Sequence, residues 1–411
     1  MKRGIIFFGL ALAAFGASAS GFGLYEASAP SYALGGAVVG RAIDASANFF
    51  NPATLTDLRS PTLTLGFMTE HPRGRMKSDL PGGRTSTMDP GVFLLPHFHF
   101  ATPLFENFAF GLGVMPEYGL GSKYDNNWDL SFNSIETTVT SVTLNPNLAW
   151  KIGDFSVGAG LRFLFFDFEQ YSNPIVHSAG YRFQNRLKGD NEMKDFGYQI
   201  GLKYDVLDNL AVGVVYKSMT RVQVEGKSCN DTNLPALAPT AAQKSGPGAH
   251  TTIDLPQSIT AGVNWDITDK WHLGGTLAWT EWSSVGQLSF HLPGQTTPKP
   301  IRLEWEDTWR VALAPSWDFA EDWTLMGSYV FETDCCGVQD STMLPPSERH
   351  MISLGLLWRF SDNLDLSLVY GMILMNGKDS ACTEPVSGET YRYSAHRALS
   401  HAAGFTLTYR F

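Results

Sequence analysis

The sequence predicts an all-β fold: a transmembrane antiparallel β-barrel of 14 strands, with a small N-terminal hatch plugging its lumen. Three observations predict this fold. Apolar and small polar residues alternate with period two through the chain after about residue 60. Short turns alternate with longer polar connections in the same region. The forty residues before it are rich in small side chains and poor in large apolar ones.

Residues 1–19 have the features of a secretory signal peptide. Lys2 and Arg3 precede an apolar run that ends at Phe15, and Ala17-Ser18-Ala19 offers a small-x-small cleavage site. The apolar run is too short for a retained membrane anchor, which needs about 20 residues. Cleavage removes two of the 30 basic residues and none of the 40 acidic ones. The resulting acidic balance argues against nucleic acid as a partner.

Residues 20–59 are expected to form the hatch, and residues 60–411 the barrel. Gly, Ala and Ser fill 17 of the forty hatch positions. So few large apolar groups cannot offset the entropy of ordering the segment, so it needs enclosure by another part of the chain. Asn51, Pro52 and Ala53 are expected to form the turn by which the hatch leaves the lumen, since Asn and Pro are turn formers.

The alternation is clearest in residues 155–168 and in the last strand. The first places one apolar set on a single face, namely Phe155, Val157, Ala159, Leu161, Phe163 and Phe165. In a soluble sandwich such faces turn inward. Here the opposite face carries Gly, Ser, Thr and single charges, and Trp and Tyr recur near the ends of the apolar stripes. Those features are typical of a lipid-facing surface with aromatic girdles.

Six short turns and seven longer connections require fourteen strands, with both termini on the side of the short turns. The turns are expected at Pro103–Asn107, Gly153-Asp154, Asp208-Asn209, Asp269-Lys270, Glu321-Asp322 and Asp362-Asn363. This pattern is that of a bacterial outer-membrane barrel, whose closure leaves no unpaired edge in lipid. The terminal aromatic, Phe411, is expected to act as a signal to the barrel assembly machinery. The predicted surroundings are outer-membrane lipid and lipopolysaccharide, and the predicted state is a monomer.

Four basic residues are expected to point into the lumen by the same parity. They are Arg162, Lys203, Arg310 and Arg359. One interpretation makes them ligand-binding cations, because a fatty acid needs a cation for its carboxylate. The other makes them structural partners of lumenal acids, of which the candidates are Asp205, Asp266, Glu306 and Asp318. The sequence leaves both interpretations open.

Cysteines and histidines give no firm site. Cys229, Cys335, Cys336 and Cys382 lie in polar stretches and are candidate disulfide partners in an exported protein. Their spacing does not favour a metal site, and His97 and His99 are interpreted as structural. No nucleophile elbow, HExxH motif or phosphate loop is present. We therefore predict a protein that is not an enzyme and needs no cofactor or metal.

A series of short motifs resembles the FadL family of outer-membrane long-chain fatty acid and hydrophobic compound transporters. The start at Gly21-Phe22 and the small-residue run that ends in Asn51-Pro52-Ala53 are similar to that family's hatch. Further matches follow in order: Tyr118-Gly119-Leu120-Gly121, Asn145-Pro146-Asn147, Val157-Gly158-Ala159-Gly160, Leu255-Pro256, Ala278-Trp279-Thr280-Glu281-Trp282-Ser283, Trp309-Arg310-Val311-Ala312-Leu313 and Pro346-Ser347-Glu348-Arg349. The resemblance covers essentially the mature chain.

The resemblance implies a ligand path from an extracellular groove to a pocket that contacts the N-terminus, and then sideways through the wall. Phe22, Leu24 and Tyr25 are the hatch residues expected to contact ligand. A kink in the third strand, about Asn107–Pro116, is expected to open the wall at Gly111, Gly113 and Pro116, since Pro and Gly weaken pairing. At the strand position where the family has a basic residue that binds the ligand head group, the nearest position in this sequence is Asp167.

Four functions follow from these observations. The first is passive uptake of hydrophobic molecules, with long-chain fatty acids as the expected ligands. The second is uptake of aromatic or aliphatic hydrocarbons by the same route, which the acid at Asp167 keeps open. The third is a general porin for polar solutes, and the fourth is a structural or adhesive role.

Overall fold

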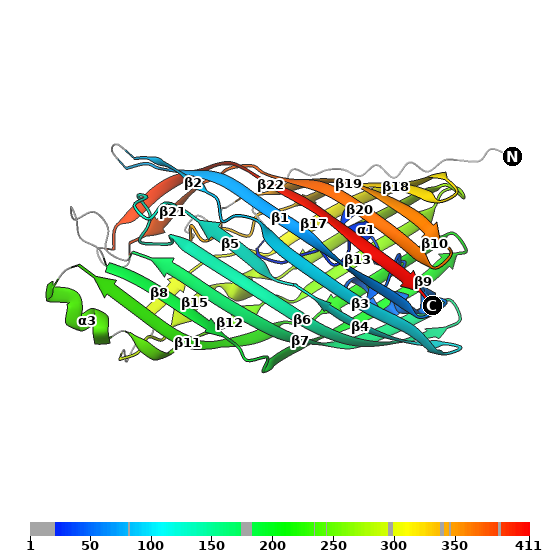
Figure 1. The fold of residues 1–411 in the computed structure, drawn as a ribbon, viewed down its shortest axis with the longest axis horizontal. Coiled ribbons are helices and arrows are strands. Elements are labelled where there is room, and N and C mark those ends of the chain that lie inside the picture. Colours follow the sequence, from blue (N-terminus) through cyan, green and yellow to red (C-terminus); the bar gives the residue numbers. More distant parts are fainter. Residues whose placement is uncertain are drawn as a thin grey trace.

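The computed structural model describes residues 21–80, 83–173, 183–233, 235–243, 245–294, 299–337, 341–344, 347–384 and 388–411. The predicted leader and Pro346 lie outside these ranges. Strands dominate, and they lie obliquely around one long cylinder (Figure 1). None of the helices in the described part has the length and hydropathy needed to span a bilayer.

Fourteen strands within the described residues form a closed antiparallel ring, which confirms the predicted fold class. Each pairs with the next, and the last pairs with the first. In ring order they are β1 (Thr62–Ser78), β3 (Phe93–Phe105), β4 (Phe108–Met115), β6 (Glu136–Ile152), β7 (Phe155–Ser172), β9 (Asp195–Leu207), β10 (Leu210–Lys217), β13 (Ser258–Asp266), β14 (Trp271–Thr280), β17 (Thr308–Ala320), β18 (Trp323–Glu332), β19 (Arg349–Ser361), β20 (Leu364–Met375) and β22 (Thr390–Arg410).

The two ends of the cylinder differ as the turn pattern predicts. All six short turns lie at one end, where the C-terminus also lies (Figure 1). At the other end the chain forms further strands instead of the loops expected there. They are β2 (Thr85–Met88), β5 (Gly119–Lys123), β8 (Phe183–Asp190), β11 (Thr220–Thr232), β12 (Gly246–Leu255), β15 (Gln287–Phe290), β16 (Lys299–Arg302) and β21 (Asp379–Thr383). β15 and β16 form a separate two-stranded sheet, and the other six strands continue the sheet of the ring.

The faces of the wall follow the predicted parity. On β7 Phe155 is 58% exposed, whereas Arg162 is 3% exposed. The same division holds on β9, where Leu202 is exposed and Lys203 is buried. Stacked aromatic pairs lie on the outer face at the short-turn end, for example Trp271 with Trp317, whose ring centroids are 5.2 Å apart. The apolar stripes therefore face outward and are bordered by aromatic rings, as a lipid-facing wall requires.

The N-terminal residues after Gly21 lie inside the ring, where the blue segment is drawn in Figure 1. They form α1 (Ala29–Ala33), α2 (Ala47–Phe50) and the 3-10 helix η1 (Pro52–Asp57). Other short helices are η2 (Pro235–Leu237), α3 (Ala238–Gln243) and η3 (Trp282–Val285). Side chains of the wall bind the hatch backbone: Ala29 N–H donates to Thr406 Oγ1 over 2.7 Å, and Gly40 N–H donates to Asn264 Oδ1 over 2.9 Å.

Candidate ligand-binding site

Two cavities lie in the lumen on the long-loop side of the hatch, and residues 23–25 line both of them. The smaller, of about 70 Å³, is called here the cationic cavity. The larger, of about 530 Å³, is called the apolar cavity. We define residues 21–25 as the N-terminal segment; among the described hatch residues, it alone contributes consecutive residues to both cavities. Its position therefore decides whether the two spaces are separate.

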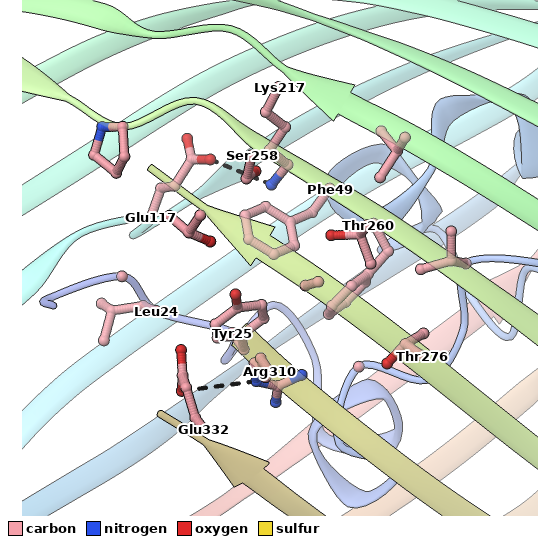
Figure 2. Close-up of a pocket in the computed structure, with 18 of the residues that line it drawn as sticks. Leu24, Tyr25, Phe49, Glu117, Lys217, Ser258, Thr260, Thr276, Arg310 and Glu332 are labelled. Carbon is pink, nitrogen blue, oxygen red and sulfur yellow. Dashed lines mark hydrogen bonds and ion pairs between the residues drawn. The ribbon is translucent and has the colours of Figure 1, made fainter. Parts of the chain in front are cut away.

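The cationic cavity is lined by three basic side chains and two acidic ones among the described residues. Arg162 comes from β7, Lys217 is the last residue of β10, and Arg310 comes from β17. The acids are Glu117, which follows β4, and Glu332 at the end of β18. Figure 2 shows Lys217 and Arg310 reaching toward the cavity from different strands. The described lining thus carries more positive than negative charge.

Glu117 holds two of these cations through both of its carboxylate oxygens. Oε1 lies 2.8 Å from an Arg162 amino nitrogen and 3.2 Å from Lys217 Nζ. Oε2 accepts from Arg162 Nε at 3.2 Å and from Thr143 Oγ1 at 3.1 Å. All three charged side chains are at least mostly buried, so each depends on the others to offset the cost of leaving water.

Aromatic faces hold the cations on the hatch side of the cavity. Lys217 Nζ lies 3.4 Å from the ring centroid of Phe49, and the Arg310 guanidinium lies 4.0 Å from that of Tyr25. Arg310 also donates to the carbonyl of Gly35 over 2.9 Å, and its Nε is 3.9 Å from Glu332. Cation–π contacts stabilise desolvated cations without neutralising them. The two rings therefore hold both basic groups beside the cavity without adding a negative charge.

The apolar cavity extends from the N-terminal segment to an interruption of the wall. The ladder between β3 and β4 ends at the pair Phe98 and Val114, and among the described residues β5 pairs only with β6. Residues 116–118 separate β4 from β5, and we call them the wall break. Leu94, Phe98 and Val142 line the cavity and are also exposed on the outer surface. The cavity therefore reaches the face of the barrel that contacts lipid.

The N-terminal segment is bound directly to the wall break. Leu24 N–H donates to the carbonyl of Glu117, and Gly119 N–H donates to the carbonyl of Phe22, each over 2.9 Å. Gly23 and Tyr118 form the antiparallel bridge between these bonds. Movement of either segment therefore requires that these backbone bonds break or that both segments move together.

The hatch turn is seated in the wall where glycines leave room for it. Asn51 Nδ2 donates to the carbonyls of Val39 (2.7 Å) and Leu202 (3.0 Å), and its Oδ1 accepts from Ala53 N–H at 3.0 Å. Pro52 begins the helix that follows. A Cβ at Gly201 of β9 would lie 1.9 Å from Asn51 Oδ1. Only glycine allows this approach.

Other predicted residues lie outside the two cavities. Lys203 pairs with Asp57 of the hatch and with Asp205. Arg359 pairs with Asp318 at the short-turn end, 3.5 Å away. These two contacts match the structural interpretation of the lumenal cations. The other two candidate acids have surroundings that the sequence does not predict. Asp266 contacts Arg41 and His272, and the Glu306 side chain is exposed.

The structure also differs from expectation in the third strand. Gly111 and Gly113 lie within β4, whose ladders to β3 and β6 are continuous at both positions. At Gly111 the missing side chain makes room for Asn48 of the hatch, since a Cβ there would lie 1.9 Å from Asn48 Oδ1. Pro116 alone of the three predicted positions falls in the wall break. Asp167 lies between buried Phe166 and Phe168 in β7, and so faces away from the lumen.

None of the four cysteines lines either cavity in the described part of the chain. The two histidines make structural contacts. Cys229 is on β11 and Cys382 on β21, while the sulfurs of Cys335 and Cys336 are 3.9 Å apart. Disulfide formation stays a prediction. His99 Nε2 lies 2.9 Å from the Ala27 carbonyl, and His97, which also lines the apolar cavity, has its Nε2 2.9 Å from Thr406 Oγ1.

Sequence reasoning missed Glu117 and Lys217. Lys217 continues the inward parity of Ala211, Gly213 and Val215 in β10, so extending the alternation by one step identifies it. Glu117 has no such signal because the alternation stops at the wall break.

A family model described as "Outer membrane protein transport protein (OMPP1/FadL/TodX)" matches residues 10–411. The chain belongs to this family. It is 23% identical to the long-chain fatty acid transport protein of Escherichia coli K12, over 91% of this chain and 92% of that protein. It is also 23% identical to outer membrane protein P1 of Haemophilus influenzae, over 88% of this chain and 87% of that protein. This family member is therefore an outer-membrane transport protein.

Solved structures show the same fold at low sequence identity. A Pseudomonas aeruginosa FadL homologue superposes with a TM-score of 0.84 at 19% identity, covering 95% of this chain and all of that one. The toluene transporter TbuX of Ralstonia pickettii gives a TM-score of 0.68 at 15% identity, covering 93% and 98%. Both superpose over nearly the whole chain, which agrees with the ring described above.

Proposed function

We propose that this protein takes up long-chain fatty acids from outside the cell by passive diffusion. The observation that carries the proposal is the pairing of the two cavities across residues 23–25. One end offers Arg162, Lys217 and Arg310 to a carboxylate. The other offers a long apolar space that reaches the wall break. A molecule with one anionic head and one long apolar tail matches both.

The charges around the apolar cavity support this orientation. Glu26, Glu70 and Glu332 line its polar side, with Arg349 among them. A carboxylate placed there would find one basic residue among three carboxyl groups, whereas the cationic cavity offers three basic residues and two acidic ones. Burial of the tail supplies the driving force, about 0.8 kcal/mol for each methylene group.

The route we propose begins at the long-loop end and leaves through the wall break into the membrane. Residues 20–59 act as a hatch that stays seated, while the N-terminal segment rearranges to join the two cavities. Ligand favours the rearranged segment only if it binds that state more tightly than the state in which the two cavities are separate. We also propose that residues 1–19 direct export of the protein. Phe411 is proposed to direct assembly of the barrel in the outer membrane.

A competition experiment tests the ligand class. Labelled oleate is bound to the purified protein in lipid nanodiscs, and unlabelled oleate or toluene is added. Displacement by oleate alone supports fatty acid uptake. Displacement by both supports a hydrocarbon carrier. We include this alternative because TbuX, a protein of similar fold, is described as a toluene transporter. Failure of oleate to bind overturns the proposal.

Planar-bilayer recording separates this function from that of a general porin. A barrel with a seated hatch is expected to pass little steady ion current. A large steady current through the wild-type protein would instead favour the porin. Co-purification of no lipophilic molecule, together with no oleate binding, would favour a structural role.

A further inference from the structure

Glu117 occupies an unusual place in the site because it belongs to both the wall break and the cationic cavity. Its backbone carbonyl accepts the N–H of Leu24 at 2.9 Å. Its own N–H is directed to Ser141 Oγ of β6 at 3.3 Å. Its carboxylate is held by Arg162 and Lys217. One residue thus links the break, the N-terminal segment and the cations that would receive a ligand.

The two cations come from strands that pair with neither β4 nor β5 in the described ladders. Arg162 extends from β7 and Lys217 from β10, so the carboxylate of Glu117 ties the break to strands further round the ring. Arg162 also contacts the next residue of the break, with an amino nitrogen 3.4 Å from Tyr118 Oη. These bonds fix the break more firmly than backbone pairing alone, because charge-assisted hydrogen bonds are about twice as strong as neutral ones.

The carboxylate of Glu117 is chemically the same group as the head of a fatty acid. Both accept two or more charge-assisted hydrogen bonds from an arginine fork and an ammonium. The cavity beside Arg162 and Lys217 is already lined by polar hydroxyls from Ser258, Thr260 and Thr276, as Figure 2 shows. An incoming carboxylate and Glu117 therefore compete for the same two cations.

We propose that Glu117 is an internal substitute for the ligand's carboxylate, and that ligand binding proceeds by exchange. The proposal rests on the proposed function. The ligand carboxylate takes the hydrogen bonds of Arg162 and Lys217, Glu117 leaves them, and no covalent bond changes. Residues 116–118 then lose their tie to β7 and β10, together with the N-terminal residues bonded to them. An anionic head thus loosens the break through which its own tail leaves.

The exchange predicts discrimination by charge rather than by chain length. A fatty acid displaces Glu117, whereas its methyl ester has no anionic oxygen with which to do so. Neutral hydrocarbons of any size can enter the apolar cavity but leave the ion pairs intact. Ligand charge therefore controls loosening of the break, and the apolar tail controls affinity.

The test compares oleate with methyl oleate on Glu117→Gln in lipid nanodiscs. Glutamine keeps the size of the side chain but removes the competing charge, so oleate is expected to bind at least about tenfold more tightly. Binding of methyl oleate is expected to stay unchanged. The matched control is Asp57→Asn, which removes a carboxylate from the Lys203 pair outside both cavities and is expected to alter neither affinity.

A second measurement uses the wild-type protein and does not depend on the variant folding. Amide hydrogen exchange at Leu24 and Gly119 is expected to accelerate when oleate is added, and not when methyl oleate is added. Unchanged oleate affinity in Glu117→Gln, an equal change for both ligands, or equal acceleration by both would overturn the exchange while leaving fatty acid uptake standing. Absence of oleate binding to the wild type would overturn both.

Discussion

The ring of Phe22 lies 5.1 Å from the ring of Trp282, at a tilt of 60° between the planes. Tyr118 and Phe166 close the other sides of Phe22, at 5.9 and 6.5 Å. Phe22 is thus the apolar anchor of the N-terminal segment, next to the backbone bonds at the wall break. Burial of this ring, together with the backbone bonds at the wall break, holds this short, Gly-rich segment in place.

Phe22→Ala is expected to release the N-terminal segment while leaving the barrel assembled. Truncating a buried Phe costs about 3 kcal/mol or more, and here the loss falls on local opening instead of global unfolding. Hydrogen exchange at the Leu24 amide should accelerate by at least about tenfold. Phe405→Ala, which removes a ring from the lipid-facing pair with Phe67, serves as the control. Unchanged protection at Leu24 would mean that the backbone bonds hold the segment without the anchor.

Gly201→Ala is expected to unseat the hatch turn. The added Cβ would lie 1.9 Å from Asn51 Oδ1, and overpacking of this kind costs about 1–3 kcal/mol. Planar-bilayer conductance should rise above that of the wild type as the turn withdraws. Gly275→Ala is the matched control, because its Cβ meets its nearest neighbour at an ordinary 3.5 Å. Equal conductance in both variants would show that the turn does not seal the lumen.

Asn51→Asp is expected to destabilise the protein by about 3 kcal/mol. The carboxylate keeps the acceptor for Ala53 N–H but loses the two bonds to the carbonyls of Val39 and Leu202, and it places a charge where it faces carbonyl oxygens. Urea unfolding in lipid vesicles measures the change. Asn209→Asp, in an exposed turn where Nδ2 donates to Asp266 O, should cost much less.

Leu313→Arg tests the orientation of the wall. Leu313 is 54% exposed on the outer face of β17, and an arginine near the bilayer midplane costs about 2–4 kcal/mol. Trp317→Arg lies closer to the short-turn end of the same face, where the cost falls to about 0–1 kcal/mol for the charge itself. Folding free energies in vesicles compare the two. A smaller loss for Leu313→Arg than for Trp317→Arg would contradict a lipid-facing position at mid-strand.

The sequence predicts the ring and the faces of its strands because both depend on a local period of two. Parity places Arg162 and Arg310 in the lumen, and both line the cationic cavity. Parity does not give depth along the barrel axis, so it cannot separate Lys203 and Arg359, which pair with Asp57 and Asp318, from the residues of the cavity. Depth depends on strand tilt and register, which are set by pairing across the whole ring.

The part of the site that the sequence does not predict is the part where the regular pattern stops. Glu117 lies between two strand segments, so no alternation assigns its direction. Its partners are 45 and 100 residues away in the chain. Such long-range contacts become visible only when the ring is closed. The role of Gly111 and Gly113 in β4 is hidden for a related reason, since their close neighbour, Asn48, belongs to the hatch.

The hatch is hydrogen-bonded to both of the strands that close the ring. Ala29 N–H binds Thr406 of β22, and Ala45 N–H binds Thr64 of β1 at 3.1 Å. These two strands are the first and last of the ring, and their pairing closes it. We expect seating of the hatch and closure of this seam to depend on each other, because Thr64 and Thr406 lie in the seam and bind the hatch. Assembly of the barrel, as well as transport, is therefore expected to be sensitive to changes in the hatch around Ala29 and Ala45.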